Sequence, residues 1–129
     1  MFANTRAYSG FAVDDLDQAA QFYGETLGIK TSVMSEENGL MSLDLAGDRT
    51  TLVYVKPDFT PATYTILNFP VDDIDQAVDE LASRGVQFER YESFEQDERG
   101  IARTPDGEGP DIAWFTDPAG NILAVLQVP

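Results

Sequence analysis

The heptapeptide Val-Asp-Asp-Leu-Asp-Gln-Ala at residues 13–19 returns almost unchanged as Val-Asp-Asp-Ile-Asp-Gln-Ala at residues 71–77. Each copy follows an apolar run and opens a helical pattern that closes at a glycine, Gly28 in the first copy and Gly85 in the second. A repeat of this kind indicates two similar supersecondary units, each too small to bury its own apolar face. The sequence therefore predicts a chain built from two related halves.

The length of 129 residues fits one domain, and a core of that size needs no disulfide or metal to be stable. We therefore expect a single domain, residues 1–129, whose repeats span approximately residues 1–57 and 62–129. The chain has neither cysteine nor histidine. Disulfides, thiolate sites and catalysis of the Ser-His-Asp or Cys-His type are thus excluded, together with the commonest metal ligand.

The net charge is −15, from 23 acidic and 8 basic residues. So acidic a surface repels phosphate backbones and anionic lipid heads, and we expect neither a nucleic-acid nor a membrane partner. Solubility is the commonest meaning of such a charge, although an acidic rim would also favour a cationic ligand. There is no long apolar run and no signal-peptide core at the start of the sequence, so we expect a cytoplasmic protein.

Hydrophobic periodicity assigns each half the order βαβββ. In the first strand, Phe11 and Val13 share one face, and Asp15 and Asp73 are predicted helix N-caps at the start of the two helices. The predicted strands span residues 8–13, 30–35, 40–45 and 50–55 in the first half and 64–71, 86–91, 111–115 and 121–128 in the second. A long charged loop, residues 92–109, separates the predicted strands 86–91 and 111–115. Its length is typical of a functional lid.

A strand ending in V-x-D, a helix with A-x-x-F-Y-x-x-x-L-G, and a second half closing on D-P-x-G-N resemble the pattern of the vicinal oxygen chelate superfamily. That superfamily includes glyoxalase I, extradiol dioxygenases, fosfomycin-resistance transferases and bleomycin resistance proteins. The matching residues are Val13, Asp15, Ala19, Phe22, Tyr23, Leu27, Gly28, Val71, Asp73, Ala77, Asp117, Pro118, Gly120 and Asn121. The resemblance covers essentially the whole chain, and its motifs are specific for the fold and not for the activity.

The resemblance implies an α+β protein in which two tandem βαβββ modules form a curved, mostly antiparallel sheet trough, in a homodimer. In metal-using members, His, Glu or Gln side chains from the first and last strands of each half hold a divalent cation in that trough. The corresponding positions here are Tyr8, Ile66 and Ala124. The first-half counterpart of Ala124 falls within residues 52–54, where Val53 is favoured and the strand register leaves Leu52 and Tyr54 open. None supplies an imidazole or a carboxylate, so we expect no metal and no cofactor, and neither glyoxalase I nor dioxygenase activity.

Strand alternation predicts which side chains line the trough: Tyr8, Gly10, Ala12, Ile66, Asn68, Pro70, Ile122, Ala124 and Leu126, with Tyr54 and Trp114 depending on the register. An apolar and aromatic lining with a few polar groups is typical of a small-molecule site. The candidate ligand-binding residues are Tyr8, Tyr54, Ile66, Asn68, Trp114 and Ala124. Trp114 could equally fill the layer between sheet and helix.

Two functions fit this lining. The first is a metal-free protein that binds a small organic molecule, aromatic or cationic, and sequesters a drug or metabolite as resistance proteins do. The alternative is a metal-independent lyase or isomerase, in which Tyr8 or Tyr54 is the general acid and an acidic residue of the 95–98 stretch (Glu95, Asp97 or Glu98) is the base. Glu98 belongs to a charged run that is more often a solvated loop, so the sequence leaves catalysis open.

Overall fold

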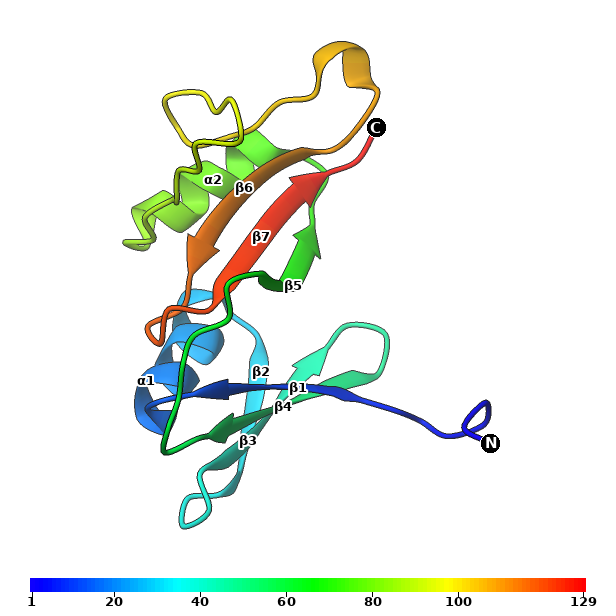
Figure 1. The fold of residues 1–129 in the computed structure, drawn as a ribbon, viewed down its shortest axis with the longest axis vertical. Helices are drawn as coiled ribbons and strands as arrows, with labels where there is room; N and C mark the ends of the chain where they lie inside the picture. The colour runs from blue at the N-terminus through cyan, green and yellow to red at the C-terminus, as the bar shows by residue number, and fades with distance from the viewer. The chain divides into compact units, whose positions relative to one another are not determined.

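The computed structural model describes residues 1–129, with the side chain of Asp106 excepted. The chain divides into two compact units, Met1–Thr60 and Pro61–Pro129, shown from blue to green and from green to red in Figure 1. Each unit has one mixed sheet and one main helix, so the protein is α+β, as the repeat predicts. None of the helices in the described part of the chain is long and apolar enough to cross a bilayer.

The first unit contains a four-stranded sheet of order β1-β4-β3-β2, in which β1 pairs parallel to β4 and the other pairs are antiparallel. Its elements are β1 (Ser9–Val13), α1 (Leu16–Gln21), η1 (Phe22–Thr26), β2 (Lys30–Ser35), β3 (Leu40–Leu45) and β4 (Arg49–Val55). The turn before β4 needs left-handed backbone at Gly47 and Asp48, with φ of 83° and 58°. Glycine and aspartate tolerate that conformation better than most residues, which is why this turn is readable from the sequence.

The repeated heptapeptides form the starts of the two helices. The Asp15 carboxylate accepts from the backbone N–H of Gln18 at 3.0 Å, and that of Asp73 accepts from Gln76 at 3.1 Å. Both N-cap predictions are confirmed. Each carboxylate bonds one of the amides that a helix start leaves without an intrahelical partner, so the acidic clusters serve the fold.

The first helix is not regular throughout. After α1 the chain widens into the π-helical turn η1, where the N–H of Leu27 donates to the carbonyl of Phe22 at 2.9 Å. Tyr23 on this turn is fully buried, with its ring centroid 5.6 Å from that of Phe11. Tyr23 therefore packs the helix against its sheet, and the Phe22 ring lies against Tyr23. A 3.6-residue pattern does not reveal a π-turn, because the turn is fixed by packing.

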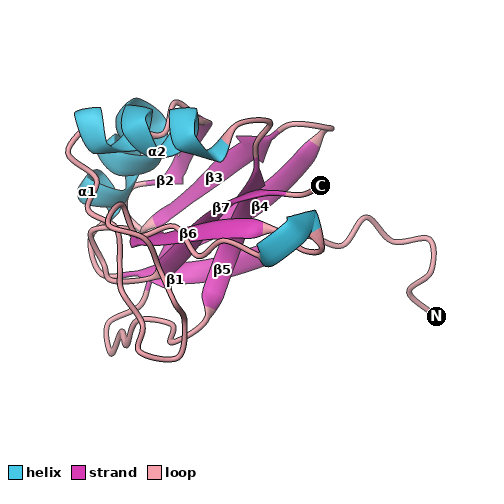
Figure 2. Ribbon diagram, turned by 90° about the horizontal axis from the view of Figure 1, so that it is seen from above, coloured by secondary structure: helices cyan, strands magenta, loops and turns pink.

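The second unit contains a three-stranded sheet of order β5-β7-β6, with β5 parallel to β7 as β1 is to β4. Its elements are β5 (Thr65–Pro70), α2 (Ile74–Ser83), a short 3₁₀ turn η2 (Pro105–Gly107), β6 (Asp111–Thr116) and β7 (Ile122–Gln127). Helix α2 packs against β6 and β7 through Ile74 and Val78 (Figure 2). The unit thus keeps the plan of the first with one strand fewer.

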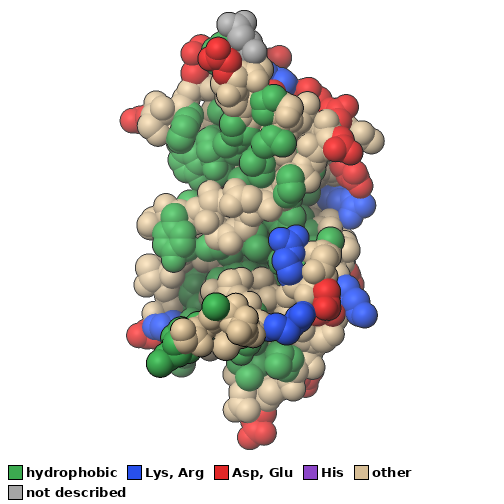
Figure 3. All heavy atoms as spheres, turned by 90° about the vertical axis from the view of Figure 1, so that its right-hand side faces the viewer, with side chains coloured by type: hydrophobic (Ala, Val, Ile, Leu, Met, Phe, Trp, Pro, Cys, Tyr) green, Lys and Arg blue, Asp and Glu red, His purple; other side chains and the backbone are tan. Residues whose placement is uncertain are grey.

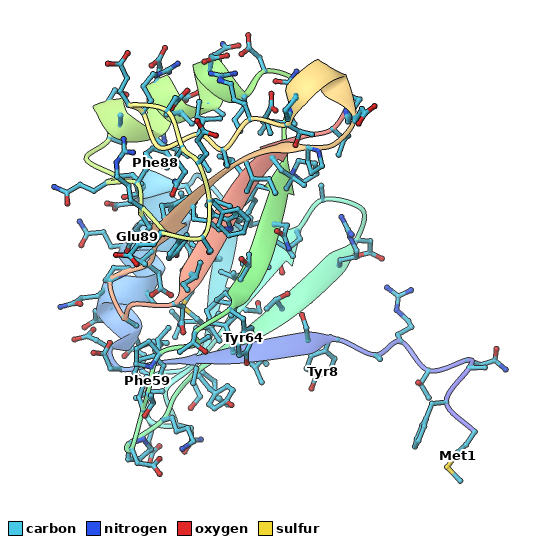
Figure 4. All side chains as sticks on the ribbon, turned by 45° about the horizontal axis from the view of Figure 1, so that its top comes forward. Met1, Tyr8, Phe59, Tyr64, Phe88 and Glu89 are labelled. Carbon is cyan, nitrogen blue, oxygen red and sulfur yellow. The ribbon has the colours of Figure 1, made fainter. Side chains whose placement is uncertain are left out.

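The predicted strand at residues 86–91 does not form. Only Phe88 bridges to Phe115 on β6, and the backbone N–H of Glu89 donates to the Trp114 carbonyl at 2.8 Å. A second isolated bridge joins Ala102 to Ile112 farther along β6. The strand position beside β6 is therefore filled by two short pieces, with the intervening chain looped out (Figures 1 and 4).

The side chain of Gln96 explains why the strand stops. Its amide nitrogen donates to the carbonyls of Glu89 at 2.9 Å and Gly100 at 2.7 Å, and its oxygen accepts from the N–H of Tyr91 at 2.8 Å. These bonds satisfy backbone groups that a strand would have paired with β6. A side chain several residues away thus replaces the β-ladder, and local strand propensity cannot anticipate that.

Candidate functional site

The register of the first unit separates its two sheet faces. Phe11, Val53 and Met41 are paired in one row across β1, β4 and β3, and all three are buried. Because Phe11 contacts Tyr23, this row lies on the helix side of the sheet. Val53 therefore cannot be the first-half counterpart of Ala124 on the opposite face, and that prediction is wrong.

The face opposite the helix carries the next rows of the same register. Gly10 pairs with Leu52, and Ala12 pairs with Tyr54. In the repeat, Gly10 corresponds to Asn68, and Asn68 pairs with Ala124 in β7. Leu52 is thus the first-half counterpart of Ala124. The prediction of Val53 differs from Leu52 by one residue, and a shift of one residue along a strand places the side chain on the opposite face of the sheet.

In the second unit, three of the candidate ligand-binding residues form one row. Asn68 on β5 pairs with Ala124 on β7, which pairs with Trp114 on β6. The repeat equates Phe69 with Phe11, so the neighbouring Phe69 row faces the helix and the Asn68–Ala124–Trp114 row faces the other way. We call this row the candidate site. Asn68 is exposed, whereas Ala124 and Trp114 are 1% and 8% exposed.

The remaining candidates are placed as follows. Tyr8 lies just before β1 and is 69% exposed, projecting from the strand in Figure 4, and the half-buried Tyr54 lies on the non-helical face of the same sheet. Ile66 is half-buried in β5, at an irregularity in the pairing with β7. Glu98 is exposed in the loop, so it lacks the partial burial that the alternative catalytic hypothesis requires of its base.

Two aromatic residues that were not among the candidates predicted from the sequence, Phe94 and Tyr91, cover Trp114. Phe94 lies with its ring centroid 4.8 Å from the indole, tilted by 37°, and Tyr91 meets the indole edge-on at 5.4 Å. The Tyr91 hydroxyl is buried and has no hydrogen-bond partner among the described residues. Burial raises the pKa of Tyr91, and the nearby Glu89 carboxylate adds to the rise. An unpaired buried hydroxyl is uncommon and is available to a polar atom of a ligand.

The donor set does not fit a metal at the superfamily position. The side chains at the corresponding positions are Tyr8 and Leu52 in the first unit, which offer one phenol oxygen, and Ile66 and Ala124 in the second, which offer no donor atom. A divalent cation needs several oxygen, nitrogen or thiolate ligands. Among the described residues there is also no group of three or more His, Cys, Asp or Glu arranged to hold one.

The second unit has apolar and acidic side chains together on one face. In the upper part of Figure 3, which belongs to the second unit, hydrophobic side chains gather at the surface with acidic side chains around them. Aromatic faces attract cations, and surrounding carboxylates raise the local concentration of cations.

The loop after α2 is tied to the helix by ion pairs. Arg99 and Arg103 both reach Asp75, at 2.6 and 2.7 Å, while Arg99 also pairs with Asp79 and Arg103 with Asp97. The donation from Arg103 holds the pKa of Asp75 below its usual value. Burial alone would raise the pKa of Asp97, but the amides of Ile101 and Arg99, with the Arg103 guanidinium, hold it below its usual value. We call these six side chains, Asp111 included at 3.9 Å from Arg103, the ion-pair cluster.

The depressed pKa values predict a loss of stability in acid. Because both folded-state values lie below those of the unfolded chain, this stabilisation is fully present above about pH 4–5 and is lost as the pH falls through the folded values. Thermal melts between neutral pH and about pH 3 should show the midpoint falling below about pH 4. In Asp75→Asn the neutral-pH midpoint should be lower and the acid fall smaller, and an identical acid fall in both proteins would contradict the assignment.

Comparison with known proteins gives a family model and many solved structures. Residues 6–125 match the model of the Glyoxalase/Bleomycin resistance protein/Dioxygenase superfamily. No curated protein sequence matches the chain. The matched range includes both main helices and every strand except the last two residues of β7, so the likeness is not confined to one repeat.

Three solved structures illustrate the likeness. TnmS3, an antibiotic binding protein from Streptomyces sp. CB03234, is 25% identical, with 95% of this chain and 96% of that one covered and a TM-score of 0.70. The fosfomycin resistance protein FosX from Listeria monocytogenes is 14% identical, with 95% and 92% covered and a TM-score of 0.71. A glyoxalase family protein from Enterococcus faecalis is 20% identical, with 98% and 99% covered and a TM-score of 0.65.

Proposed function

The chain belongs to the Glyoxalase/Bleomycin resistance protein/Dioxygenase superfamily, and we propose that within it this protein binds a small organic ligand without a metal. The ligand lies on the sheet face that carries the Asn68–Ala124–Trp114 row. The function is sequestration of a drug or metabolite. The likeness to an antibiotic binding protein at 25% identity supports this class of function over catalysis.

The observation that carries the proposal is the chemistry of that row. Ala124 corresponds to a ligand position in metal-using relatives, yet its methyl group offers no lone pair and is flanked by an indole and an amide. An indole supplies a stacking surface, and the exposed Asn68 supplies a donor and an acceptor. Those are the components of a small-molecule site with a polar group to fix the orientation.

The catalytic alternative has less support from the geometry. A general base must reach the reacting atom and hold a suitable pKa, which usually requires a desolvated carboxylate. Glu98 is exposed, and it lies outside the row formed by Asn68, Ala124 and Trp114. Replacing Tyr8 by Phe separates the hypotheses, because a binding protein keeps its affinity while an enzyme with Tyr8 as general acid loses turnover.

The binding proposal is tested by titrating the protein with acridine orange, a planar cation, and following the emission of Trp114, the one tryptophan of the chain. We expect saturable quenching that survives dialysis against EDTA. Asn68→Ala should weaken binding about tenfold, the equivalent of about 1.4 kcal/mol. Tyr64→Ala removes an exposed aromatic ring of the same unit and is the matched control.

The outcomes are distinct. Unchanged affinity in Asn68→Ala, or an equal loss in Tyr64→Ala, would place the dye elsewhere on the surface. Binding that disappears with EDTA and returns with a divalent cation would overturn the metal-free reading. Elemental analysis of the purified protein should accordingly give well under one bound metal ion per chain.

A further inference from the structure

The loop between the two bridges on β6 covers Trp114. We call residues 90–100 the covering loop: it leaves β6 after Glu89 and returns before the Ala102 bridge to Ile112. Between those points it carries Tyr91 and Phe94 onto the indole. The loop thus begins and ends on the strand that holds Trp114, and it has no strand pairing of its own.

The return end of the loop is firmly built. The Asp97 carboxylate accepts from the N–H groups of Arg99 and Ile101, both at 2.9 Å, and Ile101 is fully buried. Gly100 has a φ of 88°, and a Cβ there would lie 3.0 Å from that of Phe88. The conformation of this end is therefore strongly constrained.

The middle of the loop is held less well. Phe94 is 50% exposed, so the ring has the indole on one side and water on part of the other. Apart from that ring contact, the backbone N–H of Phe94 donates to the Tyr91 carbonyl at 3.1 Å. Local opening requires few buried contacts, and this segment meets that condition better than its ends.

The ion-pair cluster attaches the return end to helix α2. Arg99 donates to the carboxylates of Asp75 and Asp79 and, at 2.8 Å, to the Asp75 carbonyl on helix α2. Arg103 bridges Asp75 to Asp97. The guanidinium groups are about a third to a half exposed, so salt weakens these pairs. The cluster therefore connects the position of Phe94 to helix α2 through contacts that respond to ionic strength.

We infer that Phe94 is an internal occupant of the stacking face of Trp114, and that Arg99 and Arg103 are positioning residues that keep it there. The ring occupies the place on the indole that a planar guest would take, so guest binding requires Phe94 to move away. That Phe94 covers Trp114 does not depend on the proposed function. That Phe94 competes with a bound ligand rests on the proposed function.

The covering is tested without any ligand, by acrylamide quenching of Trp114 emission. Phe94→Ala and the double variant Arg99→Gln/Arg103→Gln should each raise the quenching constant by about threefold, because both expose the indole. Arg6→Gln removes an ion pair whose side chains are more than four-fifths exposed in the first unit, and it should match the parent protein. Circular dichroism and thermal melts verify that each variant is folded at the temperature used.

Ionic strength supplies a second readout that a purely structural role would not move. Raising NaCl from about 0.01 M to about 1 M shortens the screening length from about 30 Å to about 3 Å. Quenching in the parent should rise toward that of the double variant, while the double variant should not respond to salt. A folded double variant with parental quenching, or Phe94→Ala with parental quenching, overturns the inference. If the double variant does not fold, a salt-independent parent overturns it.

Acridine orange then tests the competition. If Phe94 occupies the guest's place, Phe94→Ala should bind the dye about five- to tenfold more tightly than the parent, because no ring has to be displaced. Equal or weaker binding by Phe94→Ala, with normal saturable binding by the parent, contradicts the competition and leaves the proposed function intact. Absence of binding by both proteins contradicts the proposed function for planar cations, and the covering loop is then decided by quenching alone.

Discussion

Replacing Asp117 by alanine is expected to lower the free energy of unfolding by about 2–4 kcal/mol, which is a large part of the stability of a domain this size. Asp117 and Asn121 are 4% and 2% exposed. The Asp117 carboxylate accepts from the Asn121 backbone N–H at 2.9 Å and from its side-chain amide at 3.1 Å. Alanine leaves both donors buried without this acceptor.

The turn that contains Asp117 and Asn121 also binds the segment that leads into β5. The Asn121 side-chain oxygen accepts from the N–H of Ala62 at 3.1 Å, so the D-P-x-G-N motif joins the segment before β5 to the start of β7. Urea unfolding followed by circular dichroism measures the loss. Asp117→Asn keeps one acceptor and should lose less, and Asp58→Ala, at an exposed carboxylate, should lose almost nothing. A loss under about 1 kcal/mol in Asp117→Ala would contradict the role assigned to the motif.

Replacing Trp114 by alanine is expected to cost about 3–5 kcal/mol of stability and to abolish saturable dye binding. The indole is 8% exposed and makes ring contacts with both Tyr91 and Phe94. Removing it deletes the largest apolar side chain of the candidate site and leaves two aromatic rings without a partner. The loss should therefore appear in two independent measurements, denaturant unfolding and dye binding.

Trp114→Phe is the matched control for size and stacking. It keeps an aromatic ring in the row with Ala124, so we expect most of the stability and part of the affinity to remain, with the dye's own fluorescence as the signal. If alanine at 114 removes stability but leaves dye affinity at the parental value, Trp114 is a packing residue and the ligand lies elsewhere. That result would support the packing interpretation that the sequence left open.

The parts of the fold that depend on local chemistry were predictable. The N-caps at Asp15 and Asp73 and the turn at Gly47 each follow from what a few adjacent residues can do, and the structure has them where the sequence places them. Strand limits are within a residue or two of expectation; β1, for instance, begins at Ser9 and not at Tyr8. Short-range hydrogen bonding and backbone preference suffice for features of this kind.

The failures share a different cause. The strand at residues 86–91 is lost because Gln96 bonds its backbone, and Val53 was placed on the wrong face because alternation gives no absolute register. Both outcomes depend on partners distant in the sequence or on the neighbouring strand. Sequence patterns carry that information only weakly, which is why strand assignments are context-dependent.

The site shows the same division. Strand alternation indicated Asn68, and Trp114 only if the register allowed it, while the superfamily pattern gave Ala124; the register places the three in one row, and their role in binding stays a prediction. Phe94 was missed because it lies in the predicted charged loop, and Tyr91 was missed because it was placed at the end of the predicted strand 86–91. A useful signal was present in the sequence: two aromatic residues within a run that is otherwise charged are costly to expose and indicate that the run is packed against something.

The parallel pairing of β1 with β4, and of β5 with β7, has a consequence for how a nascent chain folds during synthesis. The three strands β2, β3 and β4 are joined by short turns and can pair as soon as they are made, while β1, although synthesised first, has no sheet partner until β4 exists. The same delay applies to β5, which pairs only with the final strand. We therefore expect a translational pause before β4 or β7 is made to leave β1 or β5 without a sheet partner. A chaperone that covers exposed apolar strands would be most useful at that stage.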